Sequence, residues 1–159
     1  MKRLTGMIMI GLSVSITACQ QREIGVEAFA EGQVQKVTRA NDIKWRPCPP
    51  TLPKNCEIAI LAGHPKKPDM FTVRFHSPGD FFMPAHTHPK DERVTILKGK
   101  VAVAFGKDAT RADAMEFGPG DYYINKRGEV HKVWLEKGMV LQITGIGPWK
   151  AHFVDKHQD

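Results

Sequence analysis

The chain has 159 residues, of which 42% are hydrophobic and 25% are charged, and its formal net charge is +6 at pH 7. This length suits one domain with a sizeable hydrophobic core. The basic residues are scattered along the chain and form no block of like charge. We therefore expect no nucleic-acid partner.

The chain begins with a short basic head, Lys2 and Arg3, which an apolar stretch at residues 4–18 follows. That stretch is shorter and more polar than the roughly 20 apolar residues of a membrane-spanning helix, and it is typical of a secretory signal peptide. It ends in ITAC, which resembles a bacterial lipobox, where a peptidase cleaves before a cysteine that then carries lipid. An ordinary signal peptide, or a buried helix with an incidental Cys19, is the alternative.

The lipobox interpretation divides the chain into a lipoprotein signal peptide at 1–18, a lipidated tether at 19–40 and a folded domain at 41–159. The tether is polar and has few large apolar side chains. Gln20, and not an aspartate, follows the lipidated Cys19. By resemblance to lipoprotein sorting in Gram-negative bacteria, and assuming such a host, we expect a periplasmic protein anchored to the outer membrane through this cysteine.

Two further cysteines lie in the proline-rich segment RPCPPTLPKNCE. An exported protein meets an oxidising compartment, where cysteine pairs tend to join, so we expect a disulfide between Cys48 and Cys56. A closed loop of about nine residues would stabilise the fold by roughly 2.5 kcal/mol through the entropy of the unfolded chain. Two free thiols are the alternative, and metal ligation by this pair is disfavoured because no histidine lies close in sequence.

From Glu57 onward, short segments rich in Val, Ile, Phe, Tyr and Thr alternate with clusters of Gly, Pro, Asp and Asn. This spacing is typical of an all-β sandwich or barrel. Lys98-Gly99 predicts a tight hairpin, and residues 107–115 could hold one helical turn. In chain order, the predicted strands are EIAILAG, MFTVRFH, RVTILKG, KVAVAFG, DYYIN, HKVWLE and MVLQITGIG.

The segment PAHTHPKDERVTILKG places two histidines one residue apart, with a glutamate four positions after the second. Alternate residues of a strand face the same side, so His86 and His88 should point together, along with Phe82 and Pro84 if the strand is unbroken. Glu92 begins the next strand, where it would enter an apolar interior. A lone buried carboxylate is costly, so we expect a divalent metal beside it.

His131, at the start of a distant predicted strand, is the candidate for a fourth ligand. Together these residues resemble the two motifs of the cupins. The first, G(X)5HXH(X)3,4E(X)6G, is matched from Gly79 to Gly99 with only the first gap one residue longer. The second, G(X)5PXG(X)2H(X)3N, is matched less well, because Lys126 replaces the usual proline and Leu135 replaces the usual asparagine.

The resemblance covers roughly residues 57–154. It implies a single-domain, all-β double-stranded β-helix, which is the cupin jelly-roll barrel. It also implies that His86, His88, Glu92 and His131 hold one divalent transition metal. Nitrogen and oxygen ligands suit iron, manganese, nickel, zinc or copper, and the order of affinities does not choose among them. A cupin that has lost its metal is the alternative, which the complete ligand set disfavours.

Other polar and aromatic residues were candidates for contacts with a substrate. Arg74 alternates with apolar residues, so it either anchors an anionic substrate or lies on an exposed face. Gln142 and Thr144 share one strand face and could support the metal ligands. We expect Trp134 and Trp149 in the core or in an interface.

The ligand set leaves open positions on an octahedral ion, which suit a chelating small acid or dioxygen. The sequence thus favours a metal-dependent, dioxygenase-like enzyme for a small oxygenated or aromatic acid. Arg74, Tyr122 and Tyr123 are the candidates for an acid or base near the metal. A non-catalytic envelope lipoprotein that binds a small ligand or protects the cell is the alternative. Exposed strand edges and a small barrel also predict a homodimer.

Overall fold

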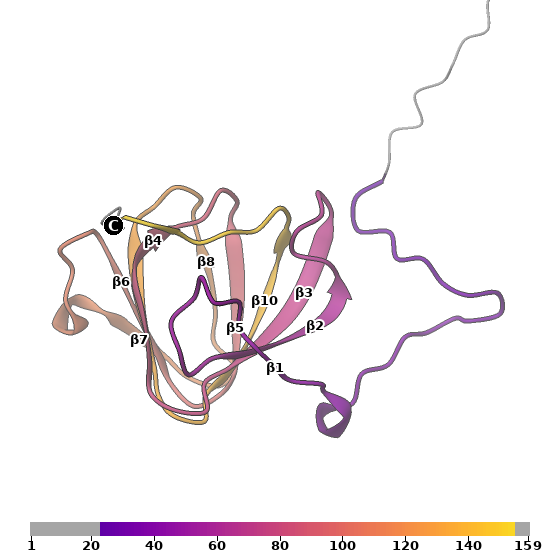
Figure 1. Cartoon of the computed structure of the whole chain (residues 1–159), viewed down its shortest axis with the longest axis horizontal. Coiled ribbons are helices and arrows are strands. Elements are labelled where there is room, and N and C mark those ends of the chain that lie inside the picture. The colour runs from indigo at the N-terminus through magenta and orange to yellow at the C-terminus, as the bar shows by residue number, and fades with distance from the viewer. Residues whose placement is uncertain (1–22, 155–159) are drawn as a thin grey trace, which may run out of the picture.

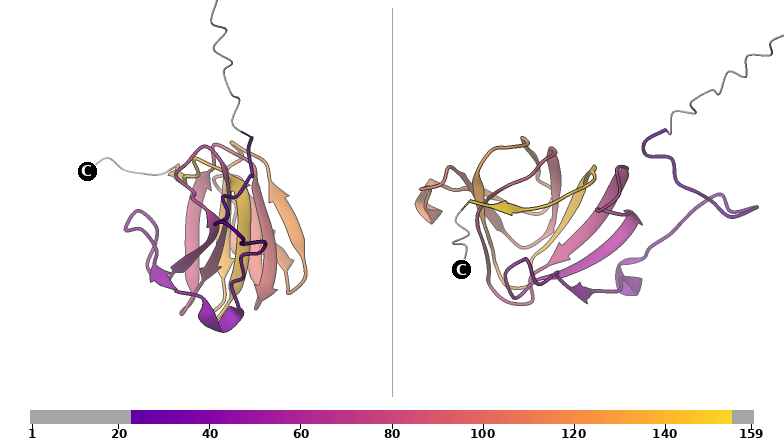
Figure 2. Two further views of the ribbon diagram at one scale, coloured as in Figure 1. Left: turned by 90° about the vertical axis from the view of Figure 1, so that its right-hand side faces the viewer. Right: turned by 45° about the horizontal axis from the view of Figure 1, so that its top comes forward.

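The computed structural model describes residues 23–154. Within this range the helical elements are two three-residue 3-10 helices, η1 (Ala40–Asp42) and η2 (Arg111–Asp113). Two antiparallel sheets curve towards one another, as Figures 1 and 2 show, and they enclose one hydrophobic core. The predicted all-β jelly-roll barrel is confirmed.

Strands that are far apart in sequence lie side by side in both sheets. The first sheet has the order β1-β2-β3-β10-β5-β8 and the second the order β11-β4-β9-β6-β7. In the first sheet the strands are, in that order, Arg46–Pro47, Glu57–Gly63, Met70–His76, Val140–Ile146, Glu92–Lys98 and Tyr122–Asn125. In the second they are His152–Phe153, Phe81–Thr87, His131–Leu135, Val101–Phe105 and Met115–Phe117.

The alternation of apolar and polar residues decides which side chains fill the barrel. On β3, Phe71, Val73 and Phe75 are buried, whereas Arg74 lies on the opposite face. The same pattern on β5 turns Val94 inward. Because the side-chain period of a strand is two, a slip of one residue would bring every polar side chain of such a strand into the core.

One local prediction is wrong. The turn at Lys98-Gly99 does not close a hairpin, because β5 pairs with β10 and β8 whereas β6 pairs with β9 and β7. The chain instead passes from one sheet to the other at this turn. Gly99 has a φ of 74°, and a Cβ atom there would lie 3.1 Å from the backbone of Met139. The turn therefore needs glycine for both its backbone angle and its close approach. The predicted helical turn within residues 107–115 is present as η2.

The predicted signal peptide at 1–18 and Cys19 lie outside the described residues. Residues 23–39 form an exposed segment that leaves the barrel beside β2 and β3 (Figure 1). Its Gly25 N–H donates a hydrogen bond of 2.8 Å to Asp69 Oδ1 on the barrel. Among the described residues, no helix is long and apolar enough to cross a membrane.

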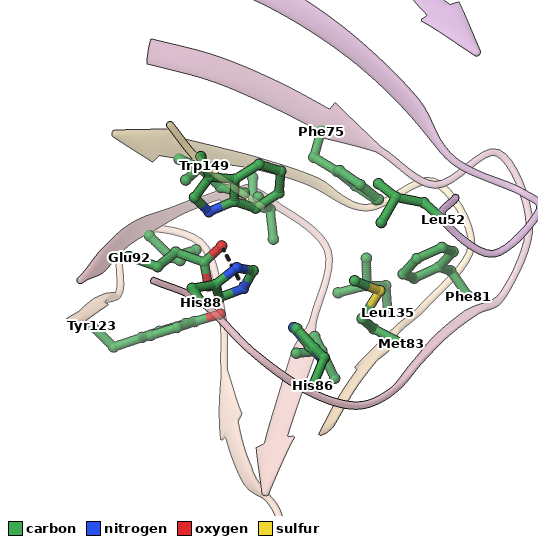
Figure 3. A pocket seen from close by; sticks show the side chains of 14 residues that line it. Leu52, Phe75, Phe81, Met83, His86, His88, Glu92, Tyr123, Leu135 and Trp149 are labelled. Carbon is green, nitrogen blue, oxygen red and sulfur yellow. Dashed lines mark ion pairs between the residues drawn. The ribbon is translucent and has the colours of Figure 1, made fainter. Parts of the chain in front are cut away.

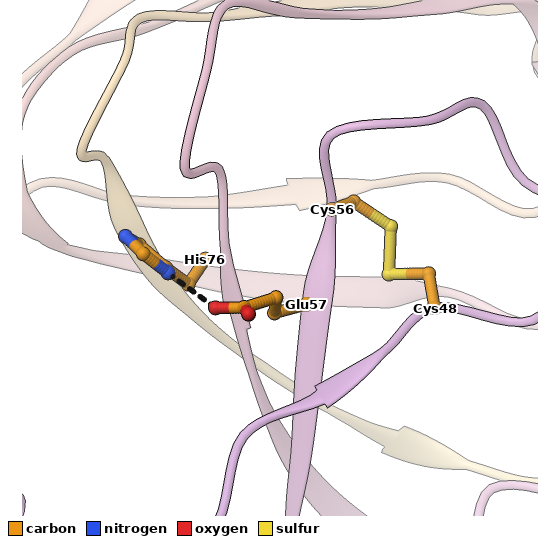
Figure 4. The surroundings of a disulfide bond; sticks show 4 residues. All are labelled: Cys48, Cys56, Glu57 and His76. Carbon is orange, nitrogen blue, oxygen red and sulfur yellow. Dashed lines mark hydrogen bonds and ion pairs between the residues drawn. A yellow bond between two sulfur atoms is a disulfide. The ribbon is translucent and has the colours of Figure 1, made fainter.

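The disulfide between Cys48 and Cys56 is present, as predicted (Figure 4). The two Cα atoms lie 5.5 Å apart, and Cys48 N–H also donates a hydrogen bond of 3.0 Å to the Cys56 carbonyl. Cys56 is buried just before β2, so the bond fixes the preceding loop to the barrel. Leu52, in that loop, packs against the core.

We expect that replacing both Cys48 and Cys56 by alanine lowers the free energy of unfolding by roughly 2.5 kcal/mol, because the unfolded chain loses its cross-link. Urea unfolding monitored by circular dichroism measures the change. Wild-type protein treated with a reductant should show the same loss. Reduced wild-type protein that keeps the stability of the oxidised form would contradict the prediction.

Candidate metal centre

Three histidines from different parts of the chain meet inside the barrel. His86 lies near the end of β4, His88 directly follows that strand, and His131 begins β9. His86 and His131 are opposite one another across the β4–β9 pair. The candidate ligand nitrogens of the three lie within 4.8 Å of one another, and all three side chains are at most 3% exposed. The structure thus brings together the three histidines selected from the sequence.

A bulge in β4 sets the direction of the first two histidines. Two residues separate Met83 from His86 on β4, whereas one residue separates their partners on β9. The extra residue shifts the alternation, so Phe81 and Met83 share the interior with His86 and His88. Phe82 and Pro84 were expected on the face of the histidines only if the strand is unbroken. The bulge removes that condition, and both side chains are exposed.

Each of the three imidazoles is oriented by a backbone carbonyl. A carbonyl can only accept, so the Nδ1 atom of each ring carries the proton and Nε2 keeps its lone pair. Hydrogen bonds of this kind are the usual support for metal-bound histidines. The acceptors are Pro84 O for His86 (2.7 Å), Lys150 O for His88 (2.7 Å) and Glu129 O for His131 (3.1 Å).

Two of the lone-pair nitrogens have no partner. The Nε2 atoms of His88 and His131 are buried and make no hydrogen bond with any described residue. Burial, reinforced by the neighbouring imidazoles, lowers the pKa of His86 to about 3. Burial also lowers the pKa of His131, against the opposing effect of Glu92. Neutral imidazoles with unused, buried lone pairs are the donors that a transition metal requires.

Glu92 completes the cluster with a negative charge. It is 6% exposed at the start of β5, with Oε1 3.4 Å from His88 Nε2 and Oε2 4.0 Å from His131 Nε2. Those two separations are longer than a good charge-assisted hydrogen bond. A buried carboxylate among lone-pair nitrogens needs a cation, so the residues present fit a divalent metal.

Asn125, which was not predicted from the sequence, holds the Glu92 carboxylate in place. Its side chain is 3% exposed and donates a hydrogen bond of 3.1 Å from Nδ2 to Glu92 Oε2. The two residues are opposite one another across the β5–β8 pair. The signal was present in YYIN, because strand alternation puts Asn125 on the same face as the inward Tyr123.

His86, His88 and Glu92 of the cluster line a cavity between the sheets, as Figure 3 shows. The volume open to the centres of water-sized spheres is about 50 Å³. Polar side chains line the end near His88 and Glu92, the metal end, and apolar side chains line the opposite end. The apolar wall consists of Leu52, Phe75, Phe81, Met83, Val94, Val133, Leu135, Leu141 and Ile143.

Two aromatic residues with polar atoms also line this cavity. Trp149 stacks on His88, with ring centroids 5.0 Å apart and 17° between the planes. Its placement in the core or in an interface was expected, but its position against a candidate ligand was not. Tyr123 faces inward, and burial together with the charge of Glu92 raises its pKa. Tyr122 is 55% exposed on the outer face and takes no part in the site.

The three other polar candidates do not line the cavity. Arg74 thus takes the outer-face alternative and not the substrate contact, and the expectation that Gln142 and Thr144 support the metal ligands is corrected. Arg74 and Gln142 are neighbours on the outer face of the first sheet, where Arg74 Nε donates to Gln142 Oε1 at 3.4 Å. Thr144 lies on the same face, with its hydroxyl 3.3 Å from that of Thr72. The reason is alternation, because the residues next to them on β3 and β10 fill the core.

The sequence pattern of the ChrR cupin-like domain family matches residues 33–150. The chain belongs to this family. The match confirms the resemblance to the cupins that the two histidine motifs carry. The search of curated proteins finds no match to the chain.

Solved structures share the cupin fold at low sequence identity. The polyketide cyclase RemF from Streptomyces resistomycificus is 18% identical, with a TM-score of 0.64 over 79% of this chain and 89% of the cyclase. An acetylacetone dioxygenase from Acinetobacter johnsonii is 18% identical, with a TM-score of 0.59 over 87% and 88%. The DMSP lyase DddQ from Ruegeria pomeroyi is 15% identical, with a TM-score of 0.56 over 81% and 76%. These similarities establish the fold of the ChrR cupin-like chain.

We expect the stability of the metal-free protein to fall as the pH decreases from 6.5 towards 3, because the pKa of His86 falls from 6.5 to about 3 on folding. In that window the unfolded chain takes up a proton that the folded chain excludes. Each pH unit then costs roughly 1 kcal/mol of unfolding free energy. Urea unfolding at several pH values, in the presence of a chelator, measures this slope.

The matched variants are His86→Gln and His152→Gln, since His152 is exposed. His86→Gln should flatten the slope below pH 6.5, the ordinary pKa of its imidazole. His152→Gln should keep the wild-type slope. Equal slopes in wild type and His86→Gln would contradict the prediction.

Proposed function

We propose that the protein is a metal-dependent enzyme of dioxygenase type that acts on a small oxygenated or aromatic acid. In this proposal, His86, His88, His131 and Glu92 bind one divalent transition metal. The observation that carries it is the pair of buried, unpartnered Nε2 atoms beside a buried carboxylate. When bound, such an ion supplies Lewis-acid chemistry and, if redox-active, reaction with dioxygen.

The surrounding residues prepare the site for this role. The backbone carbonyls fix the imidazole tautomers, so no proton must leave His88 or His131 before their Nε2 atoms bind. Asn125 keeps Glu92 oriented towards the histidines. The apolar wall limits water beside the reacting group, which strengthens electrostatic interactions there. All of these groups sit on strands or on segments anchored to them, which favours precise placement.

The structural neighbours support an enzyme that acts on a small molecule. Their names describe a cyclase, a dioxygenase and a lyase. The cavity agrees with a small substrate, because its volume of about 50 Å³ is well below the roughly 150 Å³ of an apolar cavity that accepts benzene. The same cavity would serve a non-catalytic protein that binds or sequesters a small acid, which is the competing function.

We also propose that the protein is exported, lipidated at Cys19 and held at the outer membrane facing the periplasm. The division into a signal peptide at 1–18, a tether at 19–40 and a cupin domain at 41–159 belongs to this proposal. The disulfide supports it, because such bonds persist in oxidising compartments. Metabolic palmitate labelling that is lost in Cys19→Ala tests lipidation, and a label that persists in this variant would refute it.

The predicted homodimer remains a proposal. Its motivation is the open edges of the two sheets, at β1 and β8 and at β11 and β7. An open strand edge offers unpaired backbone groups to another chain. Light scattering that gives the mass of a monomer at micromolar concentration would refute the dimer.

Metal binding is tested first. We expect His88→Ala and His131→Ala each to weaken binding of zinc by at least about 100-fold, because each variant removes a donor nitrogen. His152→Ala, which changes an exposed histidine, should bind zinc like the wild type. Competition with a chromophoric chelator measures the affinities. Equal affinity in His88→Ala, His131→Ala and wild type would exclude the proposed site.

Catalysis is tested with protein loaded separately with iron(II), manganese, nickel, copper or zinc. We expect at least one form to consume oxygen or convert a compound from a set of catechols, flavonols, thiols, keto acids and 1,3-diketones. Glu92→Ala should lose the activity. If no metal form turns over any compound, yet one binds a small acid that Glu92→Ala does not bind, the non-catalytic function replaces the enzyme.

A further inference from the structure

Two hydrogen-bond donors in the cavity have no acceptor. The indole Nε1 of Trp149 is buried and makes no hydrogen bond with any described residue. Across residues 23–154, the hydroxyl of Tyr123 has no hydrogen-bond partner either; its ring packs against Phe117. A buried indole N–H without an acceptor costs free energy, so a structure that keeps one usually supplies a partner from outside the chain.

Both donors lie at the metal end of the cavity. Figure 3 shows the indole nitrogen of Trp149 on the side of the ring towards Glu92, and the hydroxyl of Tyr123 directed at His88 from the other side. The stacking of Trp149 on His88 fixes the position of the indole relative to a candidate ligand. A molecule that reaches an ion held by His88 and Glu92 therefore comes within reach of both donors.

The other polar side chains of the cavity serve the proposed metal. The lone pairs of the imidazoles and the Glu92 carboxylate are directed at the metal position, and Asn125 holds Glu92 there. What remains for the ligand is a cation, an indole N–H that can only donate and a hydroxyl that can donate or accept, a set that favours an oxygen acceptor. Beyond these groups the wall is apolar, and Leu52 and Phe75 form part of it.

We propose that Tyr123 and Trp149 bind the oxygen atoms of a small carboxylate or enolate that is also bound to the metal, with its short aliphatic end directed at Leu52 and Phe75. This inference rests on the proposed function and narrows its substrate class. An open volume of about 50 Å³ is about a third of the roughly 150 Å³ of an apolar cavity that accepts benzene. The cavity therefore favours a short aliphatic acid over an aromatic one.

The test uses zinc-loaded protein, which binds without redox turnover, and pyruvate as the probe. Isothermal titration calorimetry measures pyruvate affinity in the wild type, in Tyr123→Phe and in Trp149→Phe. Each variant removes one hydrogen bond to a charged oxygen, so we expect pyruvate binding to weaken by at least about tenfold in each. Zinc content should remain that of the wild type, which separates loss of the donor from loss of the metal.

The chain offers a matched control for each variant. Tyr122→Phe is the same change on the outer face, and Trp134→Phe changes a tryptophan that packs on Phe82 outside the cavity. Both controls should bind pyruvate like the wild type. Benzoate should bind the wild type at least about tenfold more weakly than pyruvate, because the cavity is too small for its ring.

The outcomes distinguish the two proposals. Failure of the wild type to bind zinc would refute the proposed function. Zinc binding without measurable pyruvate binding at millimolar concentration, or with an affinity within twofold of wild type in Tyr123→Phe, would overturn the donor pair. If Trp149→Phe loses zinc, Tyr123→Phe decides alone. Benzoate that binds as tightly as pyruvate would overturn the preference for a short aliphatic acid.

Discussion

The burial of one negative charge organises the interior of this barrel. Glu92 lies 6% exposed among apolar strands, and within the described residues its side chain accepts one hydrogen bond, from Asn125. A carboxylate in such a place is tolerable only beside positive charge. His86 and His131 do not supply that charge, since burial lowers the pKa of both imidazoles. A bound cation would supply the missing positive charge. The tautomers of the histidines, the inward asparagine and the apolar wall are all consistent with such an ion.

Much of this arrangement could be predicted, because strand alternation and the cupin motifs act locally. The alternation gave the strands and the inward face of β5, and the motif spacing selected the residues that now meet in the interior. The exceptions occur where one extra residue or one long-range pairing decides. The bulge between Met83 and His86 changed which residues of β4 face the interior together with the histidines. Lys98-Gly99 had the local pattern of a hairpin, but its flanking strands pair with more distant partners.

The C-terminal segment contains what the sequence could not reveal about the site. Between β10 and β11 the chain crosses from one sheet to the other (Figure 1). On the way, the Lys150 carbonyl accepts the Nδ1 proton of His88, and Trp149 stacks on the same ring. This segment has no strand period and no motif, and a carbonyl group is common to every residue. Only the three-dimensional path of the chain shows that it supports a candidate ligand.

Through Leu52, the disulfide affects the shape of the cavity as well as the stability of the fold. This side chain belongs to the loop that Cys48 and Cys56 close, and it forms part of the apolar wall of the cavity. The shape of the pocket thus depends on a covalent bond that forms after synthesis. In a reduced chain, the loop that carries Leu52 would lack its covalent link to Cys56, just before β2. Oxidation of the two thiols therefore fixes one part of the cavity wall as well as the loop itself.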